Sequence, residues 1–228
     1  GLRPLSAVFD SYATGDHSAA HVSIVNQSPE DRDDLSVRVR VYDLAGNVRF
    51  DHTSADLDVA SGAVAPALTM PRVARDSSVF FVRCDLMDAS GAVIADNVYW
   101  QSQQRDDVGP PDNDWAFELR QVSWADMTAL NWMPKVALNV TARRVDAQAP
   151  VRIRLHNPSS RVAFFARAEL LSTPDGDEIL PIEYSDNYVT VFPGETVTIE
   201  GVVPTPNVQA DYVRVAGYNS APVVVAVQ

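Results

Sequence analysis

Residues that could carry out chemistry are few in this chain of 228 residues. None of its four histidines lies in a pattern typical of a helical zinc site, and no cluster of cysteines accompanies them. A Gly-x-Ser-x-Gly nucleophile elbow and a glycine-rich phosphate loop are also missing. We therefore assign no catalytic residue and no cofactor, and interpret the histidines as exposed or half-buried strand residues. They are His17, His21, His52 and His156.

Carboxylates are numerous, with 23 Asp and 7 Glu. A glycosidase needs two carboxyl groups about 5–10 Å apart across a sugar cleft, and a small β-sandwich offers no deep cleft for such a pair. Two acidic loops, residues 30–34 and 112–114, carry oxygen ligands of the kind that calcium accepts. Neither matches the twelve-residue calcium loop, so we interpret both as solvated turns and assign no metal site.

The tryptophans are the remaining candidates for a functional site. Four of them fall within 33 residues: Trp100, Trp115, Trp124 and Trp132. Indole rings pack against the apolar faces of sugars, so this group could contact a carbohydrate. The alternative, which we prefer, is that these side chains bury the connecting segment against two flanking domains.

Composition narrows the class of protein. The formal net charge is −12, so a phosphate backbone would repel the chain, and we expect no nucleic-acid partner. No apolar run approaches the roughly 20 residues that span a bilayer, and no signal peptide follows Gly1, as expected of a fragment or a processed chain. Cys84 is the single cysteine, on the apolar face of an alternating segment, and we expect a buried, inert thiol.

The elements that position these residues are predicted to be strands. Apolar residues alternate with polar ones in most of the chain, and this period of two is typical of strands with one buried face. Seven segments with short turns between them suit an immunoglobulin-like sandwich. The segments are residues 5–10, 21–26, 35–42, 48–52, 63–70, 79–87 and 92–100.

A second block of alternation begins near Pro134 and predicts another sandwich. Its expected strands are residues 136–140, 151–156, 163–171, 178–184, 188–192, 196–203, 211–218 and 223–227. Between the two blocks lies a polar segment with Gly109-Pro110-Pro111, a semi-rigid spacer. Ser123 and Asp126 then approximate a capping box and predict one or two helical turns that end before Pro134.

The sequence thus predicts an all-β protein, with two immunoglobulin-like β-sandwiches in series joined by a Pro-rich linker and a short helix. The expected boundaries are residues 1–102 for the first sandwich, 103–133 for the linker and helical turn, and 134–228 for the second sandwich.

Three motifs resemble the C-terminal part of family 2 glycoside hydrolases, in particular exo-β-D-glucosaminidases and, second, their β-mannosidase relatives. They are NVYW at residues 97–100, SWADMTALNWMP at 123–134, and YSDNY at 184–188 followed by FPGETV at 192–197. Within the third motif we expect a structural role for Asp186, Asn187 and Tyr188. Asp and Asn bond to their own backbone and tolerate left-handed angles, and the tyrosine ring could pack back with its hydroxyl at the surface.

The resemblance implies a non-catalytic accessory region of a secreted or periplasmic enzyme that releases glucosamine from chitosan oligosaccharides by a retaining, two-carboxylate mechanism. Such enzymes also carry a TIM barrel, which takes about 250 residues of alternating strand and helix; the present sequence shows no such pattern. The implied partners are the catalytic barrel and the N-terminal domains of the parent enzyme, and an oligosaccharide. Two alternatives remain open: a freestanding carbohydrate-binding module, and a surface adhesion or scaffolding pair.

Overall fold

The computed structural model describes residues 3–10, 20–71, 78–104, 106–109, 121–146 and 149–228. Contacts between residues divide the chain into two compact units, Gly1–Trp132 and Met133–Gln228. Each unit contains a β-sandwich, so the predicted all-β class with two immunoglobulin-like sandwiches is confirmed. Trp115, His17 and the acidic loop at 112–114 lie outside the described residues.

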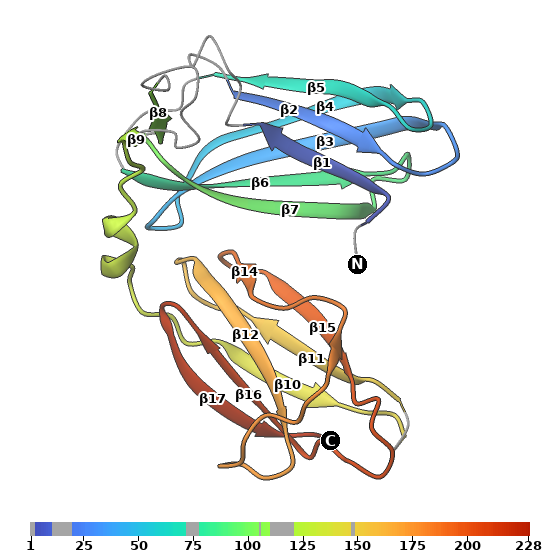
Figure 1. The fold of residues 1–228 in the computed structure, drawn as a ribbon, viewed down its shortest axis with the longest axis vertical. Coiled ribbons are helices and arrows are strands. Elements are labelled where there is room, and N and C mark those ends of the chain that lie inside the picture. The colour runs from blue at the N-terminus through green and yellow to red at the C-terminus, as the bar shows by residue number, and fades with distance from the viewer. Residues whose placement is uncertain (1–2, 11–19, 72–77, 105, 110–120, 147–148) are drawn as a thin grey trace, which may run out of the picture. The chain divides into compact units, whose positions relative to one another are not determined.

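The first sandwich packs a sheet of order β1-β2-β5 on a sheet of order β4-β3-β6-β7, with every pair of strands antiparallel (Figure 1). Its core lies between the sheets, where Val22 and Ile24 of one sheet and Val39 and Cys84 of the other are fully buried. The strands are β1 (Leu5–Asp10), β2 (Ala20–Asn26), β3 (Arg32–Asp43), β4 (Val48–Val59), β5 (Val64–Met70), β6 (Val79–Met87) and β7 (Val93–Ser102).

The connecting segment contains two short elements. Strand β8 (Asp107–Val108) pairs with β9 (Gln121–Ser123), and a 3₁₀ helix, η1 (Thr128–Trp132), follows. Asp126 lies two residues before η1, and its carboxylate accepts hydrogen bonds from the backbone N–H and the hydroxyl of Thr128, the first helical residue, at 2.9 and 2.6 Å. The helix therefore starts later than a cap at Ser123 would place it. Across the described ranges, no helix has the length and apolarity that crossing a membrane requires.

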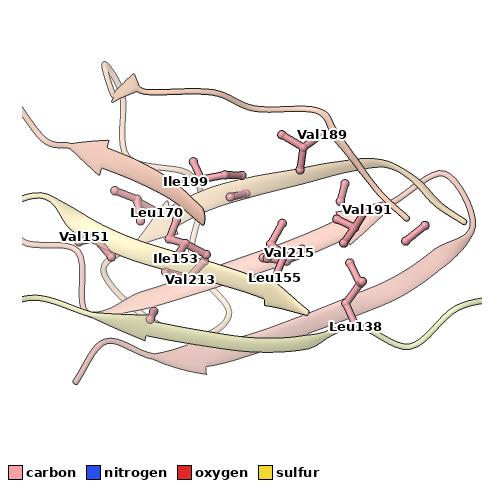
Figure 2. Packing of buried hydrophobic residues seen from close by; sticks show 14 of the residues in the cluster. Leu138, Val151, Ile153, Leu155, Leu170, Val189, Val191, Ile199, Val213 and Val215 are labelled. Atoms are coloured by element: carbon pink, nitrogen blue, oxygen red, sulfur yellow. The ribbon is translucent and has the colours of Figure 1, made fainter. Parts of the chain in front are cut away.

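The second sandwich packs a sheet of order β10-β11-β15-β13 on one of order β14-β12-β16-β17. Leucine, isoleucine and valine side chains from both sheets fill the space between them, and Figure 2 shows Ile153 and Leu155 of β11 opposite Val213 and Val215 of β16. The strands are β10 (Asn139–Arg143), β11 (Val151–His156), β12 (Ala163–Leu171), β13 (Glu183–Tyr184), β14 (Val189–Val191), β15 (Thr196–Val202), β16 (Tyr212–Gly217) and β17 (Ser220–Ala226).

Two predicted strands differ most from the observed ones, while β3, β10 and β17 begin three residues away from their predicted starts. The segment 178–184 forms only the two residues of β13 and an isolated bridge at Glu178, because Pro181 has no N–H to donate to a neighbouring strand. Strand β4 extends to Val59, seven residues beyond the predicted end. Its second half is polar and exposed at the edge of the sheet, where alternation of polarity is weak.

A buried asparagine closes the loop after the second strand of the first sandwich. The side-chain amide of Asn26 donates to the carbonyls of Glu30 and Ala60 at 2.8 and 3.1 Å, and its Oδ1 accepts from the N–H and hydroxyl of Ser28.

The second sandwich repeats this arrangement after β11. Asn157 donates to the carbonyls of Arg161 and Val191 at 2.7 and 2.8 Å, and its Oδ1 accepts from the N–H and hydroxyl of Ser159. Val191 is the last residue of β14, so Asn157 fixes the C-terminal end of this strand. Tyr188 directly precedes the other end.

Candidate functional site

The three described tryptophans come from three different elements of the chain. Trp100 lies on β7 with 38% of its surface exposed, Trp124 follows β9 with 62% exposed, and Trp132 ends η1 with 84% exposed. Both interpretations of these residues, contact with carbohydrate or burial of the connecting segment, stay predictions.

The motif at Asp186, Asn187 and Tyr188 attaches the start of β14 to β12. The side chain of Asn187 accepts from the N–H of Ala168 at 2.8 Å and donates to the carbonyl of the same residue at 2.9 Å, as a neighbouring strand would. The carboxylate of Asp186 accepts from the N–H of Asn187, and Oδ1 of Asn187 from the N–H of Tyr188. Local bonds of this kind were predicted, but the left-handed residue is Tyr188, with φ of +55°, and not the Asp or Asn.

A second residue with a left-handed backbone lies beside Tyr188. Strand β12 has an irregular register between Ala163 and Ala166, and Phe165 within that interval has φ of +54°. The rings of Phe165 and Tyr188 are in contact, with centroids 5.8 Å apart and planes tilted by 58°. Bulky residues rarely adopt positive φ, since each instance costs on the order of 1–3 kcal/mol. Two such residues therefore converge on one place.

The rings continue as a row of four side chains: Tyr188, Phe165, Phe164 and Tyr218. Phe164 meets Phe165 edge-on with centroids 4.7 Å apart, and lies 5.7 Å from the ring of Tyr218. Phe164 is buried, whereas the two tyrosines at the ends of the aromatic row are 53% and 47% exposed.

The backbone under the aromatic row is held by the turn between β16 and β17. The N–H of Phe164 donates to the buried side chain of Asn219 at 2.9 Å, and the carbonyl of Phe164 accepts from the N–H of Tyr218. Asn219 also donates to the carbonyls of Pro134 and Val162, both at 2.8 Å. A Cβ at Gly217 would approach the carbonyl of Phe164 to 3.1 Å and the Ser220 hydroxyl to 2.4 Å, so a larger residue there would require both groups to shift. The aromatic row is thus supported on both sides by asparagines.

Charged side chains lie beside one end of the aromatic row. The guanidinium carbon of Arg167 is 5.9 Å from the centroid of the Tyr188 ring. Arg167 pairs with Glu169 and Glu178, and Glu169 also accepts from Arg214. A cation against an aromatic face stabilises both groups. These carboxylates are therefore bound to arginines, and the side chain of Arg167 stays 37% exposed.

Tyr184 lies under this charged group. Its hydroxyl accepts from the N–H of Leu170 at 3.1 Å. Burial, followed by the negative charge of Glu178, raises the pKa of Tyr184 to about 12. The phenol is therefore neutral at physiological pH and acts as a structural hydrogen-bonding group.

The first sandwich carries its own charged cluster. Asp85, with 3% of its side chain exposed, accepts from Arg40 and, at 2.7 Å, from Arg83. Beside it, burial and then the charge of Asp85 raise the pKa of the Cys84 thiol to about 12. A thiol is nucleophilic only as the thiolate, so a buried, inert Cys84 agrees with these values.

The other candidate ligands do not gather. In the ranges that the structure describes, no group of three or more His, Cys, Asp or Glu side chains could hold a metal ion. His21 bonds to Thr69 and His156 to Thr196, while His52 contacts the ring of Phe50. In the acidic loop at 30–34, Asp31 accepts from the N–H of Ser61 at 2.7 Å, a bond that joins this loop to the turn at Ser61.

The described geometry provides a row of aromatic rings in contact, and the carboxylates beside it are paired with arginines. Sequence reasoning placed Tyr188 in a structural motif and did not identify Phe165. The only local signal for Phe165 is the pair Phe164-Phe165, which interrupts strict alternation.

Comparison with known families and proteins connects both sandwiches to glycosidases. Residues 18–106 match the family described as a Mannosidase Ig/CBM-like domain, and residues 116–220 match the Exo-beta-D-glucosaminidase Ig-fold domain. The second match includes part of the connecting segment, N-terminal to the unit that begins at Met133.

Two relatives that align with about nine-tenths of this chain are both named exo-beta-D-glucosaminidase. An exo-beta-D-glucosaminidase of Amycolatopsis orientalis is 30% identical over 212 residues, which cover 90% of this chain and 20% of the relative. One of Streptomyces avermitilis is 31% identical, covering 88% of this chain and 23% of the relative. The chain thus spans about a fifth of these relatives.

The solved structures agree. The crystal structure of the A. orientalis exo-chitosanase matches 98% of this chain and 26% of its own at 28% identity, with a TM-score of 0.85. A β-D-mannosidase of Dictyoglomus thermophilum, at 12% identity with a TM-score of 0.64, shares the fold. The predicted resemblance to the tandem immunoglobulin-like domains of these glycoside hydrolases is confirmed.

Proposed function

We propose that this chain, a tandem of the immunoglobulin-like domains found in exo-β-D-glucosaminidases and β-mannosidases, is a non-catalytic accessory region of a larger exo-β-D-glucosaminidase that acts on chitosan oligosaccharides. One observation carries the proposal. The alignment covers about nine-tenths of this chain but only about a fifth of the relatives named for that activity.

The role that we infer is mechanical support of a catalytic barrel elsewhere in the parent polypeptide. Both sandwiches have cores of their own, and the described carboxylates near the aromatic row are paired with arginines. Such domains hold their shape without a substrate, as support of a catalytic domain requires. We further propose that the enzyme is secreted or periplasmic, because a polymeric substrate such as chitosan is met outside the cytoplasm.

The first test concerns catalysis. The chain, expressed by itself, should release no product from p-nitrophenyl β-D-glucosaminide or β-D-mannoside, while the A. orientalis enzyme serves as the positive control. Turnover by the purified chain that co-elutes with it through two columns would refute the non-catalytic role.

The second test concerns support. In the A. orientalis enzyme, the 212-residue region aligned with this chain can be deleted or replaced by this chain. We expect the deletion to lower the melting temperature and the yield of folded enzyme, and the replacement to restore part of both. A deletion with unchanged stability, or a replacement no better than the deletion, would contradict the supporting role. Export is tested by locating the protein in fractionated cultures of its source.

A further inference from the structure

We propose that the exposed face of Tyr188, with Phe165 and Arg167 beside it, binds one pyranose unit of an oligosaccharide. The kind of sugar, a glucosamine oligomer, rests on the proposed function; the position of the site rests on the geometry of the second sandwich alone. The site deepens the supporting role by adding a contact with the polymeric substrate.

The first argument is the cost of placing these rings. Phe165 and Tyr188 both have positive φ, and their rings meet at 5.8 Å. Left-handed backbone costs an L-residue roughly 1–2 kcal/mol, and glycine or asparagine would avoid most of it. Strain of this kind is concentrated where a side chain must point in a fixed direction for binding.

The second argument is rigidity. The side-chain amide of Asn187 bonds to both backbone groups of Ala168, and Asn219 bonds to the N–H of Phe164. Asn157 fixes the far end of β14 through the carbonyl of Val191. A ring held this way loses little entropy when a ligand packs on it, so that more of the contact energy appears as affinity.

The third argument is the chemistry around the ring. Tyr188 is 53% exposed although it packs on Phe165. Arg167, whose side chain is 37% exposed and is paired with Glu169 and Glu178, places a polar group on one side, and Asp186 is exposed next to the ring in sequence. A pyranose presents an apolar face of C–H groups and a rim of hydroxyls, and an amphipathic aromatic side chain with polar neighbours complements both.

A titration followed by NMR tests the site. The 228-residue chain, labelled with ¹⁵N, is titrated with a glucosamine hexamer in 0.15 M NaCl and again in 0.5 M NaCl. The high-salt arm is needed because residues 1–132 carry twenty acidic and ten basic residues and attract a cationic oligomer non-specifically. We expect saturable shifts at the amides of residues 165–168 and 186–189 that persist in 0.5 M NaCl.

Matched variants separate the site from its surroundings. Tyr188→Ala should raise the dissociation constant of the hexamer by about tenfold or more. Tyr188→Phe, which keeps the ring, should leave this constant within about threefold of that of the unchanged chain. Tyr218→Ala is the control, since Tyr218 is 47% exposed in the same sandwich but has no positive φ. Trp132→Ala tests the tryptophan alternative. Hydrogen exchange of β12 and β16 verifies that each variant stays folded.

Each remaining outcome overturns the site. The proposed site is contradicted by shifts that survive Tyr188→Ala, by shifts that vanish in 0.5 M NaCl, and by shifts confined to Trp100, Trp124 or Trp132. It is also contradicted if no saturable shift is seen at 10 mM hexamer, a concentration about tenfold above a 1 mM Kd. None of these results bears on whether the chain supports a catalytic barrel, which the deletion and replacement experiment decides.

Discussion

Asn26 and Asn157 occupy equivalent places in the two sandwiches, yet the strand ends that they fix are used differently. In the first sandwich, the described non-glycine residues with positive φ are Asp34 and Asp56, which are polar turn-forming types. In the second, Asn207 is again a polar type, but Phe165 and Tyr188 also adopt this backbone, and their rings are in contact. The shared asparagines are explained by folding alone, whereas the strained aromatics need a further reason, which a ligand provides.

The charged clusters of the two sandwiches also differ, in how far their arginine side chains are exposed. In the first sandwich a single buried carboxylate, Asp85, is held between two arginines whose side chains are 15% exposed. In the second, Arg167 is 37% exposed and lies against an exposed ring. The first cluster is therefore buried within a sheet face, and the second leaves an ion-paired arginine partly exposed beside an aromatic ring.

The largest effect should come from breaking the buried cluster with Asp85→Asn. The variant leaves Arg40 and Arg83 without their shared carboxylate, and the loss of one partner from a buried ion pair costs about 3–5 kcal/mol. Native-state hydrogen exchange should show this loss in β3 and β6 but not in β11 and β12.

The matched control is Asp51→Asn, because Asp51 pairs with Arg38 at the surface, where such pairs contribute about 0.2–1 kcal/mol. Equal losses in the two variants would mean that burial of Asp85 does not matter, and that the contrast between the clusters is wrong.

A smaller loss, about 2–3 kcal/mol, should follow from either Asn26→Ala or Asn157→Ala. Each substitution removes a buried amide and leaves carbonyls without a donor, such as that of Val191. Labelling of Cys84 by a thiol reagent reports opening of the first sandwich, so Asn26→Ala should accelerate it. Asn157→Ala should leave that rate unchanged and increase exchange in β12. Acceleration of Cys84 labelling by both variants would show that the sandwiches do not unfold independently.

The sequence predicted the strands of the two sandwiches better than it predicted the roles of Asn26, Asn157 and Phe165. Alternation in β3 and β11 is strong because one face of each strand is buried. The paired asparagines give only a short signal, Asn-x-Ser after a strand, whose meaning depends on distant carbonyls. The backbone of Phe164, next to the displaced register at Phe165, bonds to Tyr218 and Asn219, more than fifty residues away. Local patterns therefore found the scaffold, and long-range bonds positioned the site.

Alkaline pH should weaken the second sandwich through Tyr184. The pKa of this phenol is about 12 in the folded chain against an ordinary value of about 10. The folded state therefore holds its proton more tightly, and the stability that this contributes is complete below pH 10 and is lost as the pH rises toward 12. The free energy of opening that hydrogen exchange reports in β12 should fall between pH 10 and 12. We expect this fall to be smaller by about 1 kcal/mol in Tyr184→Phe than in the unchanged chain. Parallel declines in both proteins would assign the effect to other groups.

The smallest effect tests the strain itself, by comparing glycine with alanine at the two exposed tyrosines. At position 188 both substitutions remove the same ring, so their difference reports the backbone: Tyr188→Gly should be more stable than Tyr188→Ala by about 1 kcal/mol, because glycine adopts positive φ without cost. At position 218, where φ is not positive, alanine should be at least as stable as glycine. The sign of the difference should thus reverse within one aromatic row, as measured by urea unfolding followed through exchange in β12 and β16. Alanine equal to or better than glycine at position 188 would remove the strain from which the sugar site was inferred, and Phe165 and Tyr188 would then be ordinary packing residues like those of the first sandwich.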